Sequence, residues 1–225
     1  MTDTLEYLAR PPRLDTGAPP PVVVLFHGYG ADMHDLASLG DVMDPRLLVV
    51  SVQAPIDLTT VGFPGGRAWF HLHQGPDGGI QYDADGARES VVIAAEFIKA
   101  MTSAMECDED RVVVMGFSQG AMISHALLLK GLVPLAGIAA CSGRLVHELI
   151  DDADAARQNV PEDLPVLLTH GTLDELIPIE NGHALRDFYQ TTPAHLTYVE
   201  EPVGHGIGSD GAAALAAWSR QVLDE

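Results

Sequence analysis

Short apolar runs recur along the chain, and polar or mixed segments separate them. Each run is continuously apolar and does not alternate with polar residues, a pattern typical of strands that are buried on both faces of a parallel sheet. The predicted strands are residues 22–26, 47–52, 112–117, 135–141, 166–170 and 195–200.

Helical patterns lie between these strands. Apolar positions recur there at the spacing of three and four residues that is expected of a helix with one buried face. The predicted helices are residues 35–43, 83–101, 119–131, 179–190 and 211–225, and Gly40 weakens the first of them. Because strands and helices alternate, we expect right-handed crossovers and an α/β fold with a mostly parallel central sheet flanked by helices.

The chain has 225 residues, which is enough for one domain with a substantial core. We expect residues 1–225 to form a single domain, with a short first strand ahead of a proline-rich turn at 10–21. About twenty residues separate Ser142 from Leu164, too few for a lid of several helices, so we expect no large cap domain. The glycine- and aromatic-rich segment 59–79 is expected to be a long loop, and such loops are often functional.

Acidic residues dominate the charged positions. The formal net charge is −20, and Lys99 and Lys130 are the only lysines. Binding to nucleic acids or to anionic membranes requires clustered cations, so the composition argues against both. Two interpretations of the acidity stay open, an ordinary acidic surface and an adaptation to high salt.

The location of the protein is also constrained by the apolar pattern. No apolar stretch reaches the roughly 20 residues that span a bilayer, and the first residues contain no apolar core of a signal peptide. We therefore expect a cytoplasmic protein without stable membrane insertion. In a reducing compartment, Cys107 and Cys141 are expected to stay unpaired.

A serine between two glycines follows the third of the long apolar runs. The sequence GFSQG at 116–120 fits the G-x-S-x-G pattern, in which a strand turns sharply into a helix and exposes a strained serine. Residues two before and two after the serine crowd each other, and glycine relieves that contact. We therefore expect Ser118 to be a nucleophile at the strand edge.

A serine nucleophile needs a base and an acid that orients the base. On folds of this kind the chain order is serine, acid, histidine. Asp174 follows the predicted strand 166–170, and His205 lies between the last strand and the last helix. The carboxyl ends of parallel strands share one sheet edge, so these two residues are predicted to meet Ser118 there.

An oxyanion formed at the serine would need two N–H donors. The loop after an early strand, HGYG at 27–30, predicts Tyr29 N–H as one donor, and Gln119 N–H after the serine is the other. A phosphate-binding interpretation of HGYG fails, because the full glycine pattern and a P-loop lysine are missing. His71 and His73 have metal-ligand character, but we find no third ligand at a suitable spacing and expect no cofactor.

The segments FHGYGAD, GGRAWFHL, VVVMGFSQGAM, HGTLDELIPIE and VGHGI occur in the order found in the carboxylesterase and acyl-protein thioesterase family of α/β-hydrolases, also called the phospholipase/carboxylesterase group. The chain resembles this family from about Pro21 to Leu223. The resemblance implies a triad of Ser118, Asp174 and His205 and an oxyanion hole of Tyr29 and Gln119. It also implies that Trp69 lines an acyl pocket.

The expected activity is cleavage of carboxylic esters of short to medium acyl chains through an acyl-enzyme. The alternatives are an acyl-protein or acyl-coenzyme A thioesterase, a lysophospholipase, and a non-catalytic binding protein on a hydrolase fold. Phe63 in the long loop, with Leu176 and Ile177 after Asp174, is expected to shape the acyl site. The predicted partner is a small acyl ester or thioester, and a homodimer is one option for the assembly.

Overall fold

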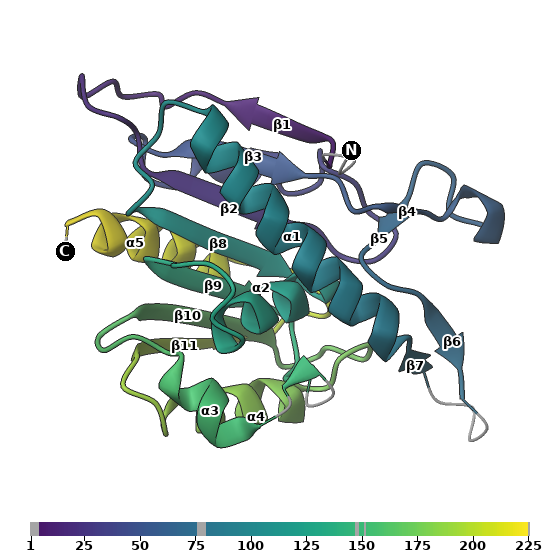
Figure 1. Ribbon diagram of the computed structural model, residues 1–225. Helices are drawn as coiled ribbons and strands as arrows, with labels where there is room; N and C mark the ends of the chain where they lie inside the picture. Colours follow the sequence, from purple (N-terminus) through teal and green to yellow (C-terminus); the bar gives the residue numbers. More distant parts are fainter. Residues whose placement is uncertain (1–4, 76–79, 147–148, 151, 225) are drawn as a thin grey trace.

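The protein is described by a computed structural model that covers residues 5–75, 80–146, 149–150, 152–224. Its centre is a seven-stranded sheet (Figure 1) with the strand order β1-β3-β2-β8-β9-β10-β11. The strands of this sheet are β1 (Tyr7–Arg10), β2 (Val22–Phe26), β3 (Leu48–Val52), β8 (Val112–Phe117), β9 (Gly137–Cys141), β10 (Pro165–Gly171) and β11 (His195–Glu201).

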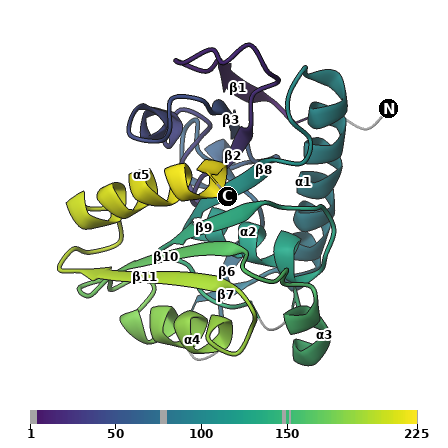
Figure 2. The same ribbon diagram turned by 90° about the vertical axis from the view of Figure 1, so that its left-hand side faces the viewer.

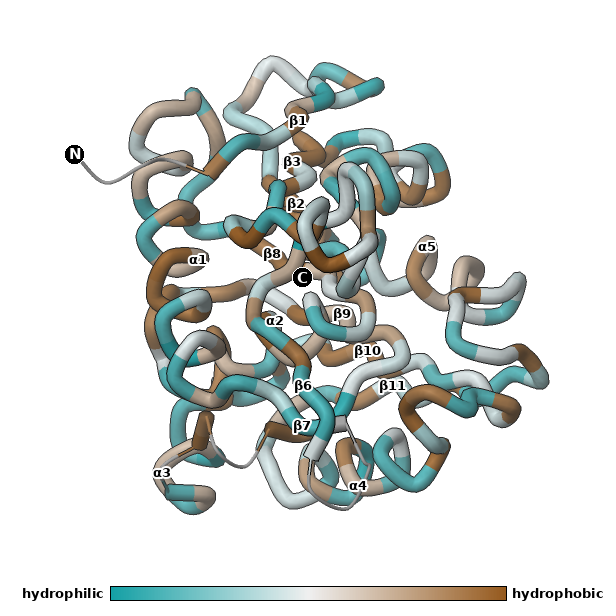
Figure 3. The backbone as a smooth tube through the Cα atoms, turned by 90° about the vertical axis from the view of Figure 1, so that its right-hand side faces the viewer, coloured by the Kyte–Doolittle hydropathy of each residue, from teal (hydrophilic) through white to brown (hydrophobic). Residues whose placement is uncertain are grey.

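All neighbouring strands of this sheet run parallel except β1, which pairs antiparallel with β3. Continuous apolar runs suit this sheet, because helices cover both of its faces. Along β2, Val22, Val24 and Phe26 point into one core, and Val23 and Leu25 point into the other. Figure 3 shows the hydrophobic stretches of the central strands and of the helices beside them.

The helices lie on opposite sides of the sheet, and Figure 2 shows α5 on one side and α1 on the other. Residues of α1, α2 and α4 belong to the larger core on one face, whereas α5 packs in the smaller core on the other. The helices are α1 (Ala84–Ala104), α2 (Gln119–Leu129), α3 (Ala153–Gln158), α4 (Ile179–Tyr189) and α5 (Ser209–Asp224). The prediction of a mostly parallel sheet flanked by helices is therefore confirmed.

Two local predictions were wrong, and one short helix was missed. The helix expected at 35–43 is only a 3-10 turn, η1 (Ala37–Asp41). Gly40 packs closely there on Val49, since an added Cβ would lie 3.0 Å from a Val49 methyl. The short helix α3 was not predicted. The segment 59–79 is not one long loop, because it contains the 3-10 helix η2 (Thr59–Val61) and two short strands. Strand β5 (Arg67–Ala68) pairs with β4 (Ile56–Asp57), and β6 (Leu72–Gln74) pairs with β7 (Ile80–Tyr82), so that two small hairpins form. Residues 76–79 of this segment lie outside the described part.

The segment between β9 and β10 contributes no large cap. Within its described residues, α3 is the only α-helix, and it has six residues. The carboxyl edge of the sheet is thus not covered by a separate helical layer from this segment. Across the described part of the chain, no helix has both the length and the apolar character needed to cross a bilayer. Cys107 and Cys141 are free, as predicted, and both are buried.

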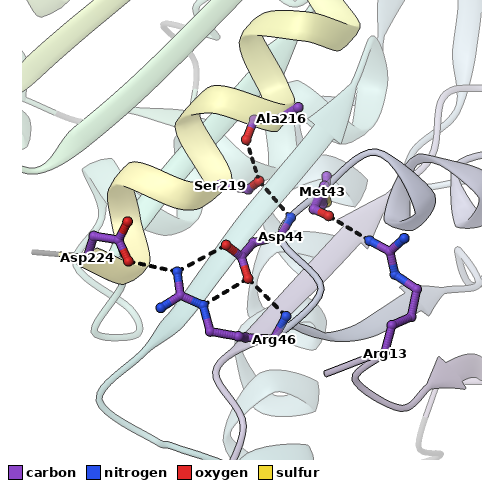
Figure 4. A network of polar contacts seen from close by, with 7 residues as sticks. All are labelled: Arg13, Met43, Asp44, Arg46, Ala216, Ser219 and Asp224. Atoms are coloured by element: carbon purple, nitrogen blue, oxygen red, sulfur yellow. Dashed lines mark hydrogen bonds and ion pairs between the residues drawn. The ribbon is translucent and has the colours of Figure 1, made fainter. Parts of the chain in front are cut away.

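The last helix is tied to the opposite, amino edge of the sheet. Arg46, in the loop before β3, donates to Asp44 at 2.9 Å and to Asp224 at 2.7 Å, and Figure 4 shows its guanidinium between the two carboxylates. Ser219 of α5 accepts a hydrogen bond from the Asp44 amide at 3.0 Å. The C-terminal end of α5 is therefore fixed to a distant part of the sequence.

Candidate active site

Ser118 stands at the sharp turn between β8 and α2. Its backbone has φ 54° and ψ −114°, a left-handed region that few non-glycine residues adopt. The Ser118 amide donates to the Cys141 carbonyl at 2.9 Å, which ties the turn to the neighbouring strand β9. A strained backbone held by its neighbours is common at functional sites.

The two glycines of GFSQG are required by close backbone contacts. A Cβ added to Gly116 would overlap the Gly120 carbonyl oxygen, as the sequence pattern predicts. A Cβ added to Gly120 would overlap the carbonyl oxygen of Phe26, at the end of β2. Both positions therefore require glycine, because α2 starts in direct contact with the ends of two strands.

The structure brings the three predicted side chains into one hydrogen-bonded row. Ser118 Oγ lies 2.8 Å from His205 Nε2, and His205 Nδ1 lies 2.7 Å from Asp174 Oδ2. The Asp174 carboxylate only accepts hydrogen bonds, so Nδ1 carries the proton and Nε2 accepts from the serine hydroxyl. These residues come from three separate loops at the carboxyl ends of β8, β10 and β11.

Asp174 is held by the loop that it begins. Its side chain is fully buried. Its Oδ1 accepts from the amides of Leu176 at 2.9 Å and Ile177 at 2.8 Å, which leaves Oδ2 for His205. His170 lies 3.6 Å from the same Oδ2 and bonds through Nε2 to the Ile177 carbonyl at 2.8 Å. The carboxylate therefore has a fixed orientation toward the imidazole.

The loop that carries Tyr29 is held in place by the hydrogen bonds of the buried His27 side chain. The buried imidazole of His27 accepts from the Ala54 amide through Nε2 at 3.1 Å and donates through Nδ1 to the Gly28 carbonyl at 2.8 Å. Burial lowers the pKa of His27, which keeps its imidazole neutral as this pairing requires. The same loop pairs with β5, since the Gly30 amide donates to the Arg67 carbonyl at 2.9 Å.

The two predicted oxyanion donors lie on segments next to the serine: Gln119 follows it directly, and a Cβ added to Gly28, the neighbour of Tyr29, would lie 3.3 Å from Ser118 Cβ. Gln119 is the first residue of α2, where helix amides lack an intrahelical acceptor. In the part of the chain that the structure describes, neither the Gln119 amide nor the Tyr29 amide donates to another protein group. Both amides therefore remain candidate oxyanion donors, and the positive end of the α2 dipole favours an anion at the start of that helix.

The side chain of Gln119 has a role that the sequence did not indicate. It is buried, accepts from the Trp69 amide at 2.7 Å and donates to the Phe70 carbonyl at 2.8 Å. These two bonds lock the segment after β5 onto the start of α2. Ser90 of α1 supports the same segment by donating to the Trp69 carbonyl.

The prediction that Trp69 lines an acyl pocket is not supported by its position. The indole is 0% exposed, packs edge-on against Phe26 and donates to the His27 carbonyl at 3.0 Å. A side chain without accessible surface cannot contact an acyl chain in this conformation. Trp69 instead forms part of the core below the loop that carries Tyr29.

The other predicted pocket residues differ in exposure. Phe63 is 46% exposed and lies edge-on to Tyr29, with ring centres 5.5 Å apart. Leu176 is 67% exposed and follows Asp174 by two residues. Ile177 is half-buried and packs on the larger core, so it supports the loop more than it offers a binding surface. Phe63 and Leu176 thus present apolar surface next to the candidate oxyanion donor and the acid.

Three supporting residues around His205 were missed at the sequence level. The Phe117 ring lies 4.9 Å from the His205 ring. The Ser142 hydroxyl is 3.5 Å from the Gly206 carbonyl. The Glu201 carboxylate accepts from the Gly208 amide, which follows His205 by three residues. Phe117 occupies a variable position of the G-x-S-x-G pattern. Ser142, with φ 49°, follows a buried strand and gives no local signal. Only the meeting of the three loops reveals these contacts.

The comparison with known families covers most of the chain. A family described as phospholipase/carboxylesterase matches residues 15–218. A curated relative, acyl-protein thioesterase 1 of Candida albicans, is 27% identical in an alignment of 214 residues, and the alignment covers 90% of this chain and 92% of that protein. The match therefore includes all the loops that form the site.

Solved structures show the same arrangement of strands and helices. Esterase PE8 is 27% identical and superposes with a TM-score of 0.78 over 97% of this chain and 99% of that one. A carboxylesterase of Bacillus cereus, 20% identical, superposes with a TM-score of 0.77 over 98% and 95% of the two chains. At 20% identity, the second likeness concerns the fold alone.

Proposed function

Since the chain belongs to the phospholipase/carboxylesterase family of α/β-hydrolases, and is thus a hydrolase, we propose that it cleaves carboxylic esters of short to medium acyl chains through an acyl-enzyme. The observation that carries this proposal is the row of hydrogen bonds from Ser118 Oγ through His205 to Asp174, at 2.8 and 2.7 Å. Such a row lets an imidazole take a proton from a hydroxyl while a carboxylate stabilises the resulting imidazolium.

In the first half of the reaction, Ser118 Oγ attacks the ester carbonyl carbon while His205 Nε2 takes the hydroxyl proton. The carbonyl π electrons move to oxygen, and the Tyr29 and Gln119 amides donate to that oxyanion. The intermediate collapses, the bond to the leaving oxygen breaks, and His205 returns its proton to the departing alcohol. Removing one such oxyanion donor costs other hydrolases roughly 3–4 kcal/mol of barrier.

In the second half, water replaces the alcohol. His205 takes a proton from the water as its oxygen attacks the acyl carbon, and the same two amides hold the second oxyanion. Collapse breaks the bond between the acyl carbon and Ser118 Oγ, and His205 returns the proton to the serine. The products are the alcohol and the carboxylic acid, and the enzyme is regenerated.

The surface beside the row supports an acyl substrate. Phe63 and Leu176 expose large apolar side chains next to Tyr29 and Asp174, respectively. Exposed apolar groups at a site of this kind are suited to an acyl chain. The net charge of −20 disfavours the approach of anionic lipids, so we favour neutral esters over anionic lysophospholipids.

A thioester substrate is the second candidate. It is favoured by the relative from Candida albicans, a protein named as an acyl-protein thioesterase that matches 90% of this chain. The same serine, base and oxyanion donors would cleave either bond. Matched acyl esters and thioesters of increasing chain length, assayed side by side, separate the two candidates by their kcat/KM values.

The proposal is tested by Ser118→Ala with nitrophenyl esters as substrates. We expect kcat to fall by at least about 10³-fold, because the nucleophile is lost. Ser103→Ala, an exposed serine of α1, is the matched control and should keep wild-type turnover. A fluorophosphonate probe should label the wild type and the control but not the Ser118 variant. Near wild-type hydrolysis by Ser118→Ala would exclude this mechanism.

A further inference from the structure

A buried carboxylate closes the loop that carries His205. Glu201 is the last residue of β11 and is 3% exposed. Its Oε1 accepts from the amides of Gly208 at 2.8 Å and Gly211 at 3.3 Å, and its Oε2 accepts from the Asp210 amide at 3.3 Å. One side chain thus joins the end of the strand to the start of α5, and His205 lies on the chain between these two points.

The space around this carboxylate is shaped to hold it. A Cβ on Gly208 would overlap Glu201 Oε2, and a Cβ on Gly211 would lie 2.6 Å from Oε1. Both residues must therefore be glycine for the carboxylate to reach the amides. This requirement explains two of the glycines in the segment after His205.

The charge of Glu201 is balanced by backbone groups. Within the described part of the chain it makes no ion pair with a basic side chain. Its three donors are amides at the first turn of α5, where unsatisfied N–H groups and the positive end of the helix dipole favour an anion. The interaction therefore depends on this helix start and on the carboxylate together.

The backbone of the same residue reaches the loop of Asp174. The Thr172 amide donates to the Glu201 carbonyl at 2.8 Å, and the Leu173 amide donates to the Val203 carbonyl at 3.0 Å. A Cβ on Gly171 would overlap the carbonyl oxygens of this neighbouring loop. The acid loop and the histidine loop are thus packed backbone to backbone, with Glu201 at their shared base.

We propose that Glu201 is a positioning residue whose carboxylate fixes the loop 202–208 and so holds His205 between Ser118 and Asp174. The proposal rests on the proposed function for its effect on turnover. The imidazole must satisfy two short hydrogen bonds at once, so a small shift of its loop lengthens at least one of them. Gly206, which has no heavy atom within 4 Å of an added Cβ, gives the loop no side-chain contact of its own.

The test variant is Glu201→Gln. Its amide oxygen can still accept from Gly208 and Gly211, but its NH₂ group would face the Asp210 amide, and the negative charge is lost. We expect kcat to fall about 10- to 100-fold, because misplacement of a catalytic group by about 1 Å costs roughly that factor. KM should stay within about twofold, since Glu201 does not reach the substrate surface.

The matched control loosens the other end of the same helix. Arg46→Met removes the contacts to Asp44 and Asp224 and leaves the His205 loop untouched. If the two variants lose a similar amount of Tm, Arg46→Met should keep the wild-type kcat whereas Glu201→Gln should not, so general destabilisation cannot explain the difference in kcat. Glu201→Asp, which keeps the charge but is one methylene shorter, should restore part of the kcat. An equal loss of kcat in Glu201→Gln and Arg46→Met would overturn the proposal.

A spectroscopic measurement makes the test independent of turnover. The proton on His205 Nδ1, bonded to Asp174, should give a downfield NMR signal that His205→Ala lacks. We expect Glu201→Gln to broaden that signal or move it upfield, and Arg46→Met to leave it unchanged. If the wild type showed no Ser118-dependent hydrolysis, the proposed function would fail while this signal still tested Glu201.

Two further results would overturn the positioning role. The first is a folded Glu201→Gln protein with kcat within twofold of wild type and an unchanged His205 signal. The second comes from hydrogen exchange in the wild-type protein, and it tests the positioning role even if neither Glu201 variant folds. In the wild-type protein, the Gly208 and Gly211 amides should exchange with solvent as slowly as those in the middle of α5, and unprotected amides would contradict the proposal.

Discussion

At the scale of single residues, Asp174 shows how a carboxylate divides its two oxygens between structure and chemistry. Oδ1 accepts from two amides of its own loop, and Oδ2 accepts from His205. The first pair of bonds fixes the rotation of the carboxylate, and the second selects the imidazole tautomer whose Nε2 can accept a proton. The same division makes the effect of an amide substitution predictable.

In Asp174→Asn, the amide oxygen should keep the place of Oδ1, because only an oxygen can accept from Leu176 and Ile177. The NH₂ group would then face His205 Nδ1 and force the proton onto Nε2. We expect kcat to fall by about 10⁴-fold, as in other triads with this change, while Tm moves by no more than a few degrees. Steady-state kinetics and thermal melts check both parts.

The control is Asp174→Ala, which loses the two loop bonds as well. It should lower both kcat and Tm, because the Leu176 and Ile177 amides lose their acceptor. Retention of more than a tenth of wild-type kcat in Asp174→Asn would show that the carboxylate does not set the tautomer.

At the scale of elements, α5 is fixed at both ends by carboxylate contacts of different kinds. Glu201 binds the amides at its start, and Arg46 binds Asp224 at its end. Burial acts to raise the pKa of Asp44, but hydrogen bonds from Arg46 outweigh it and hold that pKa below its usual range. Arg46 therefore neutralises a buried charge as well as joining the helix to the loop before β3.

Arg46→Met should lower the free energy of unfolding by about 1–3 kcal/mol at pH 7, the usual value of hydrogen bonds to a charged group. A carboxylate with a lowered pKa adds stability above its unfolded pKa and loses it as the pH falls through the folded value. The difference between wild type and variant should therefore shrink below about pH 4. Urea unfolding at pH 7 and pH 3.5 measures it, and a constant difference would exclude the Asp44 contact as its source.

The helices α2 and α4 are joined by a buried histidine–tyrosine pair. His125 Nδ1 and Tyr189 Oη are 2.8 Å apart, and both side chains are buried. Burial lowers the pKa of His125 to about 3. The unfolded chain binds a proton near pH 6.5 whereas the folded chain does not, so the stability from this residue is complete above pH 6.5 and lost as the pH falls toward 3.

Acid should therefore begin to weaken the fold at a pH above the usual pKa values of carboxylates. We expect His125 to contribute at most about 1.4 kcal/mol of lost stability per pH unit between pH 6 and pH 4.5. The double variant His125→Phe/Tyr189→Phe keeps an aromatic ring at both positions and removes both polar groups, so its stability should fall less steeply with acid. Urea midpoints across this range test the difference, and parallel slopes would refute it.

At the scale of the whole molecule, charge is the unusual property. A net charge of −20 on 225 residues repels itself in the compact state, and salt screens that repulsion. The Debye length falls from about 10 Å at 0.1 M to about 3 Å at 1 M salt. The response of stability to salt can therefore separate the two interpretations of the acidic composition.

We expect Tm to rise as sodium chloride increases from about 0.02 M to about 0.5 M, where the Debye length already falls below the spacing of most surface charges. Simple screening predicts a plateau beyond that concentration. Adaptation to high salt predicts a continued rise of Tm and of activity into the molar range. A Tm that is independent of salt would show that self-repulsion does not limit stability.

Much of the fold followed from local patterns. The buried parallel strands, the long helices and the sharp turn at Ser118 each depend on neighbouring residues, so the apolar runs and the two glycines indicated them. The prediction of a helix at 35–43 was wrong, because Gly40 and its packing on Val49 outweighed a weak helical pattern. The small strands within 59–79 were not predicted, since two- and three-residue strands have no readable period.

The features of the candidate site also fall into two groups, those that the sequence determined and those that only the tertiary structure decided. The sequence by itself determined that the strand ends bring Ser118, Asp174 and His205 to one edge, because chain order and parallel strands fix that edge, and it marked these three side chains as the catalytic candidates. Only the tertiary structure decided their distances, the burial of Trp69, and the contacts of Phe117, Ser142 and Glu201. Those contacts join loops that are far apart in sequence, and side-chain packing between distant segments leaves no periodic signal in the chain.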